Sequence, residues 1–162
     1  MKIRKTTLKD LKTVLDVYAI ARETMRKSGN PNQWQNNHPA KEIILEDIKN
    51  GNSYVIENNS KICGVFAFIL GEDPTYQTID GKWLNNQPYG TIHRIASNNQ
   101  VKGVLNCCLN FCKTKIKNIK IDTHNDNLIM QHLLEKYGFS KCGIIYLEDG
   151  SPRIAYQKSF KD

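Results

Sequence analysis

A polar loop at 100–103, with the sequence Gln-Val-Lys-Gly, joins an alternating segment at 90–96 to an apolar-periodic segment at 103–115. Alternation predicts a strand, and a period of 3.6 residues predicts a helix. A loop that leads directly into a helix leaves several backbone N–H groups unpaired, where the helix dipole adds a positive potential. Gly103 permits close backbone approach, and Lys102 adds a charge. The sequence therefore predicts a phosphate-binding loop.

This loop is neither of the two best-known phosphate loops. It lacks the Gly-Lys-Ser/Thr run of a Walker A motif, and Gly103 stands alone where a dinucleotide fingerprint needs three glycines. It resembles the Gln/Arg-x-x-Gly-x-Gly/Ala loop of the GNAT superfamily of N-acetyltransferases, which holds the pyrophosphate of acetyl-coenzyme A (acetyl-CoA). Leu105 replaces the second small residue.

A second segment, 127–139, resembles the Asn-led helix of the same family that ends in Lys-x-Gly-Phe. A strand predicted at 119–123 separates it from the loop, as that fold requires. With two motifs in this order, the chain is identified as a member of the GNAT superfamily over essentially its whole length. The resemblance implies acetyl-CoA as co-substrate, a primary amine as acceptor, direct transfer and no metal.

His93 is the candidate general base. Some family members place a glutamate on this strand, and the matching position here is Tyr89. By alternation Tyr89, Thr91, His93 and Ile95 share one face. A histidine with an ordinary pKa near ~6.5 could take a proton directly or through water; the alternative is a hydrogen-bonded structural histidine. Arg94, on the other face, is expected to anchor a carboxylate or carbonyl.

The general acid departs from the family pattern. The family's tyrosine position holds Leu134, and Tyr137 follows three residues later, most of a helical turn away. Tyr137 is a candidate acid only if the helix ends differently. A thiol pKa near ~8.5, against ~10 for tyrosine, makes thiolate a fair leaving group without one. We expect Leu134 to face the acetyl end of the cofactor and Tyr137 to lie away from the sulfur.

The resemblance also assigns the acetyl-CoA contacts. The backbone around Ile95 and Ser97 would hold the pantetheine arm as an added strand, and the N–H near Ile95 would receive the thioester oxygen. Asn127 would bind the pantetheine amides or, alternatively, cap its helix. The expected contacts are Ile95, Ala96, Ser97, Gln100, Val101, Lys102, Gly103, Val104, Leu105, Asn106 and Asn127.

The acceptor site is expected in the loops. Trp34, Trp83 and Tyr89 lie in otherwise polar loop sequence, where they either line an acceptor pocket or pack the loops onto the core. Gln33 and His38 flank the first of these. The acidic residues that would attract a cationic amine, if they converge, are Glu72, Asp73, Asp80, Glu148 and Asp149. The amine itself, a small molecule or a peptide N-terminus, stays open.

The elements that must position these residues follow from periodicity and from turn residues. We expect strands at 3–5, 53–57, 62–70, 90–96, 119–123, 142–148 and 153–159, and helices at 7–29, 39–51, 103–115 and 126–136. A long loop at 73–88 is expected to be functional or mobile. This order predicts one α/β domain, 1–162, with the GNAT fold: a central, mostly antiparallel twisted sheet, a splayed fourth and fifth strand pair, and flanking helices.

The amino-acid composition limits the classes of binding partner that we expect. A net charge of +7 fits a solvated surface, nucleic acid or a phosphate-rich ligand, and lysines at 102, 113, 115, 117 and 120 are expected to form a basic rim beside the loop. No helix interleaves basic and aromatic residues, so no nucleic-acid partner is expected. No apolar run suits a membrane or a signal peptide, so we expect a cytoplasmic protein. Five cysteines without a CxxC pair predict reduced thiols. The sequence does not decide between monomer and homodimer.

Three functions from different classes are considered, in order of preference. The leading hypothesis is an acetyl-CoA-dependent N-acetyltransferase. The alternative is a GNAT-fold regulatory module that binds acyl-CoA without turnover, which Leu134 and the missing strand glutamate support. A basic nucleic-acid-binding protein is third.

Overall fold

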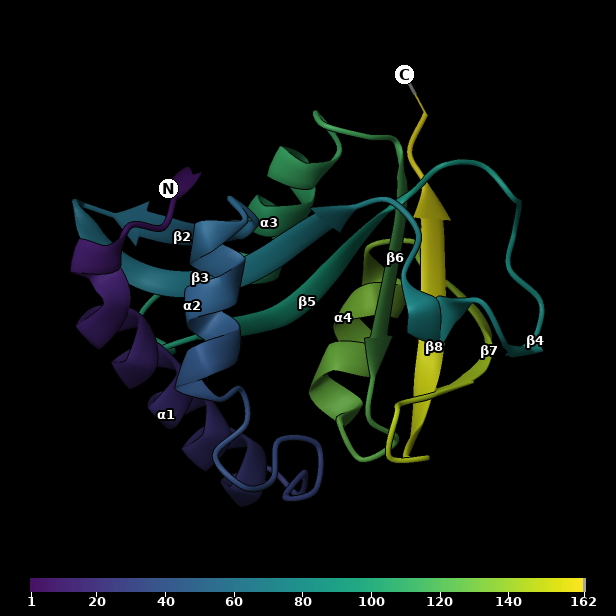
Figure 1. Cartoon of the computed structure of the whole chain (residues 1–162), viewed down its shortest axis with the longest axis horizontal. Helices are drawn as coiled ribbons and strands as arrows, with labels where there is room; N and C mark the ends of the chain where they lie inside the picture. Colours follow the sequence, from purple (N-terminus) through teal and green to yellow (C-terminus); the bar gives the residue numbers. More distant parts are fainter. Residues whose placement is uncertain (162) are drawn as a thin grey trace.

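The computed structural model describes residues 1–161, which form one mixed sheet with helices on both faces (Figure 1). The eight strands lie in the order β1-β2-β3-β5-β6-β8-β7-β4. The strands are β1 (Lys2–Lys5), β2 (Ser53–Asn58), β3 (Lys61–Leu70), β4 (Asp80–Gly81), β5 (Gly90–Ser97), β6 (Asn118–Thr123), β7 (Ser140–Tyr146) and β8 (Pro152–Ser159). The helices are α1 (Leu11–Lys27), α2 (Lys41–Lys49), α3 (Val104–Cys112) and α4 (Leu128–Lys136), with short 3-10 turns η1 (Leu8–Asp10) and η2 (Pro74–Tyr76).

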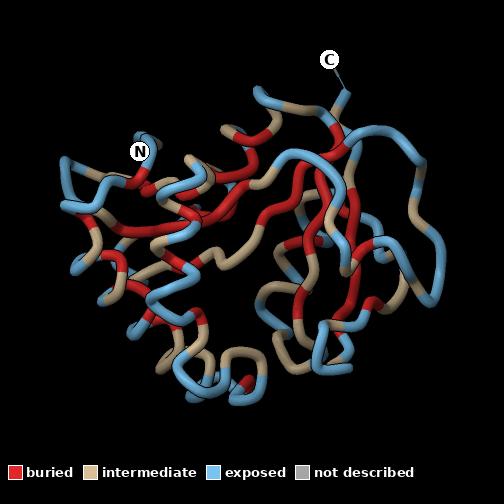
Figure 2. Tube along the Cα trace, viewed as in Figure 1, coloured by how far each residue is buried: buried red, intermediate tan, exposed pale blue. Residues whose placement is uncertain are grey.

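The helices divide between the two faces of the sheet. Apolar residues of α1 and α2, such as Val14 and Ile44, pack on one face against Val65 and its neighbours. Residues of α3 and α4, such as Cys108 and Leu134, pack on the other face in a separate cluster. Figure 2 shows the buried residues running along the strands between these layers. The apolar helix faces predicted from the sequence periodicity are therefore buried against the two faces of the sheet.

The sheet separates at its centre. β5 and β6 are parallel and pair only at Gly90–Ile119 and Thr91–Lys120, whereas all other described strand pairs are antiparallel. Beyond Thr91 none of the described strands pairs with this edge of β5, and β5 and β6 diverge (Figure 1). This is the splayed pair expected from the family resemblance, and the predicted fold is confirmed.

Several predicted details differ. The second helix begins at Lys41 and not at Pro39, because Ala40 keeps an extended backbone as the residue before the helix. The loop 73–88 contains η2 and the short edge strand β4, which pairs with β7. The alternation of β5 is interrupted by a bulge, with Arg94 at a φ of 52°. Within residues 1–161 we find no helix with the length and apolar character needed to cross a membrane.

Candidate functional site

Two cavities occupy the region where β5 and β6 separate. The larger has a volume of about 810 Å³ and the smaller about 250 Å³. Ile95 on β5 and Met130 on α4 line both, so the cavities adjoin there. The larger volume lies within the range of small-molecule sites. Two adjoining cavities suit a reaction between two substrates.

The smaller cavity contains the predicted phosphate loop. Gly103 is the residue before α3 and adopts a φ of 86°, which a glycine takes without strain. Of the expected acetyl-CoA contacts, those that line this cavity are Ile95, Ala96, Ser97, Val101, Gly103, Val104 and Leu105. Gln100 and Lys102 are exposed on the loop and Asn106 is exposed on α3, and none of the three is among the residues that line this cavity.

The opposite wall of the smaller cavity is one face of α4 together with the residue that follows the helix. It consists of Ile129, Met130 and Leu133, which the sequence analysis did not assign to the site, and of Tyr137, the candidate acid. The spacing 129, 133, 137 is that of a single helical face, so periodicity could have identified it. Leu134 instead is fully buried in the core and lines neither cavity. The expected arrangement is thus reversed, because Leu134 points to the sheet while Tyr137 follows the last helical residue and turns toward the cavity.

Asn127 caps α4. Its Oδ1 accepts a hydrogen bond from Met130 N at 3.0 Å, and its Nδ2 donates to Gln33 Oε1 at 2.9 Å. It lines the larger cavity and not the smaller. Capping, which the sequence left as the alternative, is the role seen here.

The expected basic rim is only partly present. Lys102 is exposed on the loop, but Lys113 and Lys115 follow the other end of α3. A nine-residue helix rises roughly 1.5 Å per residue, which separates them from the loop by more than about 12 Å. Lys120 is buried, with Nζ 3.9 Å from the ring centre of Trp83 and 3.8 Å from that of Tyr89. The expectation that these lysines surround the loop was wrong.

The packing around Lys120 also accounts for two of the residues predicted to contact the acceptor. Trp83 and Tyr89 enclose Lys120 and are not among the residues that line either cavity. Trp34, in contrast, lines the larger cavity and packs edge-on against Tyr18, with ring centres 5.7 Å apart. Of the three aromatic residues, one lies at the cavity.

His93 and Asp73 form the central polar pair of the larger cavity. His93 Nε2 lies 2.7 Å from Asp73 Oδ2, and both side chains are less than one-fifth exposed. Burial raises the pKa of Asp73, but hydrogen bonds from His93 and Thr75 outweigh burial and bring the pKa to about 2. An ionised Asp73 accepts a hydrogen bond from Nε2–H, which leaves Nδ1 as the basic nitrogen of the imidazole.

Asp73 is held in place by its own loop. Its backbone N donates to the hydroxyl of Tyr89 at 2.8 Å, and its Oδ1 accepts from Thr75 N at 2.9 Å at the start of η2. Tyr89, at the position that matches the family's glutamate, thus positions the carboxylate partner of His93. The sequence analysis named Asp73 only as one of several acidic residues that would attract a cationic amine. No spacing signal linked it to His93, twenty positions away.

Arg94 forms the expected anchor. Its Nε and Nη2 donate to Asp47 of α2 at 2.8 Å and 2.7 Å, and its carbonyl oxygen accepts from the Tyr18 hydroxyl at 2.7 Å. The prediction of a carboxylate anchor is confirmed. These bonds tie the bulge of β5 to both helices on one face.

Asp122 of β6 and Arg153 of β8 line the cavity on the other side of the gap. Asp122 Oδ2 accepts a hydrogen bond from the Tyr76 hydroxyl at 2.6 Å, and burial raises the pKa of this carboxyl against that bond. Burial lowers the pKa of Arg153, which Asp122 and Asp149 partly oppose.

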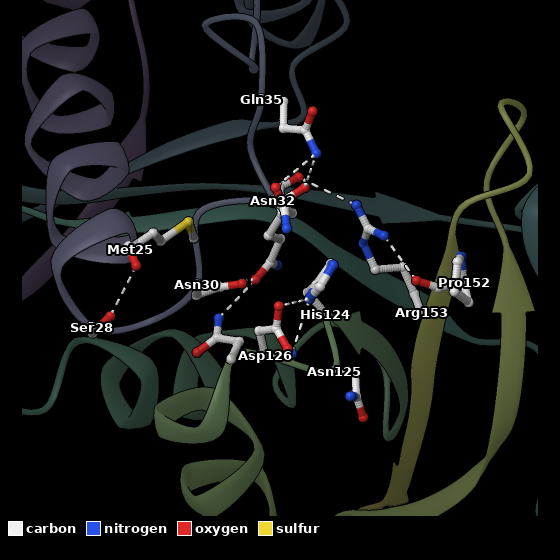
Figure 3. Close-up of polar contacts among 12 residues, drawn as sticks. Met25, Ser28, Asn30, Asn32, Gln35, His124, Asn125, Asp126, Pro152 and Arg153 are labelled. Atoms are coloured by element: carbon white, nitrogen blue, oxygen red, sulfur yellow. Dashed lines mark hydrogen bonds and ion pairs between the residues drawn. The ribbon is translucent and has the colours of Figure 1, made fainter.

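The loop between α1 and α2 forms one wall of the larger cavity. Gln33 Oε1 accepts hydrogen bonds from Asn30 and Asn127, and the Gln33 carbonyl accepts one from Arg153 at 3.2 Å. Figure 3 shows this loop lying across the helix α4 and the start of β8. The loop therefore joins the two halves of the divided sheet.

The acidic residues converge in part. Asp73, Glu148 and Asp149 line the larger cavity, as does His38, whereas Glu72 and Asp80 do not. Across residues 1–161 no cluster of three or more histidine, cysteine or acidic side chains is arranged to hold a metal ion.

Comparison with solved structures identifies the class of protein. A GNAT-family acetyltransferase from Streptococcus agalactiae has 32% sequence identity and a TM-score of 0.89, with 99% of this chain and 96% of that chain covered. A Staphylococcus aureus protein named only provisionally as an acetyltransferase has 28% identity and a TM-score of 0.72, with 99% and 100% covered. A GNAT-family acetyltransferase from Listeria monocytogenes shares the fold at 18% identity and a TM-score of 0.72, with 98% and 94% covered.

This chain belongs to the GNAT superfamily of acetyltransferases. No protein-family model and no curated protein matches the sequence.

Proposed function

We propose that this protein is an N-acetyltransferase that moves the acetyl group of acetyl-CoA to a primary amine by direct attack. The observation that carries the proposal is the junction of the two cavities at Ile95 and Met130. One cavity holds the glycine-led loop and the free edge of β5, and the other holds a histidine oriented by a carboxylate.

The geometry of the smaller cavity supports the proposal that it binds acetyl-CoA. Gly103 has no Cβ, and only a methionine side-chain atom lies within 4 Å of the place where one would stand. The first amides of α3 lack intrahelical partners and meet the positive end of the helix dipole, as a pyrophosphate requires. Beyond Thr91, β5 has a free edge on which the amide groups of a pantetheine arm can pair.

The reaction then assigns roles to the residues of both cavities. The amine nitrogen attacks the thioester carbonyl, a C–N bond forms, and the C–S bond breaks. His93 Nδ1 accepts the proton of the amine, with Asp73 stabilising the imidazolium. A backbone N–H of β5 near Ile95 stabilises the oxyanion. The sulfur leaves as thiolate or takes a proton from water or from Tyr137.

The test is thiol release from acetyl-CoA against a panel of amines, with mass detection of the acetylated product. We expect turnover with at least one amine and loss of that turnover in His93→Gln. Acetyl-CoA binding by calorimetry with no turnover on any amine would instead support a regulatory module. A cytoplasmic location, where acetyl-CoA is available, fits the enzyme.

A further inference from the structure

The two arginines of the larger cavity differ in how their charges are balanced. Arg94 forms a two-bond ion pair with Asp47. Arg153 is 7% exposed, yet within residues 1–161 its hydrogen bonds go only to backbone carbonyls, Pro152 O at 2.8 Å and Gln33 O at 3.2 Å. No described carboxylate forms an ion pair with it. A guanidinium has five N–H donors, and a buried charge is costly without an ionic partner.

We propose that the acceptor amine carries a carboxylate, which binds the guanidinium of Arg153. This inference rests on the acetyl transfer proposed above and names its substrate class: an amino acid or a related amino-carboxylate. A planar carboxylate accepts two parallel N–H bonds from a guanidinium, which gives both strength and orientation.

The remaining charges of the cavity fit such a zwitterion. Asp73, Glu148 and Asp149 line the cavity and attract the ammonium group, while Arg153 takes the anionic end. Asp122 and Asp149 also act electrostatically on Arg153. They repel a doubly charged phosphate more than a singly charged carboxylate, so the carboxylate is the better match.

The experiment compares amino acids with their amides, which keep the amine and side chain but lose the negative charge. O-phosphoethanolamine supplies the phosphate arm. The first readout is the acid-to-amide ratio of kcat/KM from thiol release. The second is calorimetric binding of the same compounds to the protein saturated with coenzyme A, which needs no turnover.

We expect wild-type protein to prefer acids over amides. Arg153→Gln should lower the acid-to-amide ratio by about 10- to 100-fold, the scale of a hydrogen-bonded charge, and Arg153→Lys should restore part of it. Thermal unfolding checks that each variant is folded, and if Arg153→Gln is not, Arg153→Lys decides.

The two proposals fail separately. Acetylation of amides or simple amines as efficient as that of acids would overturn the carboxylate site and leave the acetyltransferase standing. Preferred use of O-phosphoethanolamine would also overturn it. If no amine is acetylated, the acetyltransferase proposal fails, and binding of acids to the coenzyme A complex still decides: loss in Arg153→Gln supports the site, and no binding to wild type refutes it.

Discussion

The two cavities are built in different ways. The smaller takes its walls from two continuous segments, the end of β5 with the loop into α3, and one face of α4. The larger draws on side chains from α1 through β8, including Trp34, His93, Asp122 and Arg153. The first recognises a ligand mainly through backbone geometry, and the second through side chains brought together by the fold. The difference suggests that binding and chemistry can be disrupted independently.

The largest expected effect separates chemistry from binding. His93→Gln should lower kcat/KM by about 100-fold or more, the usual contribution of a positioned base, with acetyl-CoA affinity unchanged. The exposed His132→Gln on α4 is the matched control. If the pH–rate profiles of His93→Gln and wild type overlay, His93 is structural and the base is water.

The converse change acts on the smaller cavity alone. Gly103→Val should raise the Kd for acetyl-CoA by about tenfold or more, because a β-branched side chain resists a φ of 86° and blocks close approach of a phosphate. Gly150→Val places the same strain, also at a φ of 86°, in the β7–β8 turn and serves as control. Calorimetry measures both. Equal affinities for the two variants would remove the loop from the site.

A smaller effect is expected one contact away from the base. Asp73→Asn removes the carboxylate that orients His93, so kcat/KM should fall by about tenfold with acetyl-CoA affinity kept. Asp80→Asn, exposed in the same loop, is the control.

The same substitution has a pH signature in stability. The pKa of Asp73 falls from 3.8 to about 2 on folding, so its ionised form stabilises the protein above pH 4. Wild type should therefore be more stable than Asp73→Asn at neutral pH, and the difference should shrink as pH falls from 4 toward 2. A constant difference in urea unfolding across that range would contradict the pairing.

The difference between the two cavities also explains which features of the molecule could be predicted from the sequence. The fold and the loop around Gly103 were predictable because periodicity and a short motif determine them locally. The pairing of His93 with Asp73 was not predictable, because nothing in the spacing of residues in the loop that carries Asp73 and η2 pointed to His93. Trp83 shows a different limit: an aromatic residue in a polar loop predicts burial, but not that its partner is the side chain of Lys120. The sequence did not distinguish Arg153 from any other strand residue, because its place beside the cavity depends on the pairing of β6 with β8.

The smallest expected effect concerns Tyr137, a candidate for chemistry in the cavity that we assign to acetyl-CoA binding. It lines the smaller cavity, so geometry alone permits it to protonate the departing sulfur. A thiol is nonetheless a stronger acid than a tyrosine, by roughly 1.5 pKa units, so the sulfur can leave as thiolate without a donor. Tyr137→Phe should therefore change kcat/KM by less than about threefold, well below the 100-fold typical of a positioned acid. Tyr146→Phe, exposed on β7, is the control. A 100-fold loss with unchanged acetyl-CoA affinity would make Tyr137 the acid and would extend the chemistry from the larger cavity into the smaller.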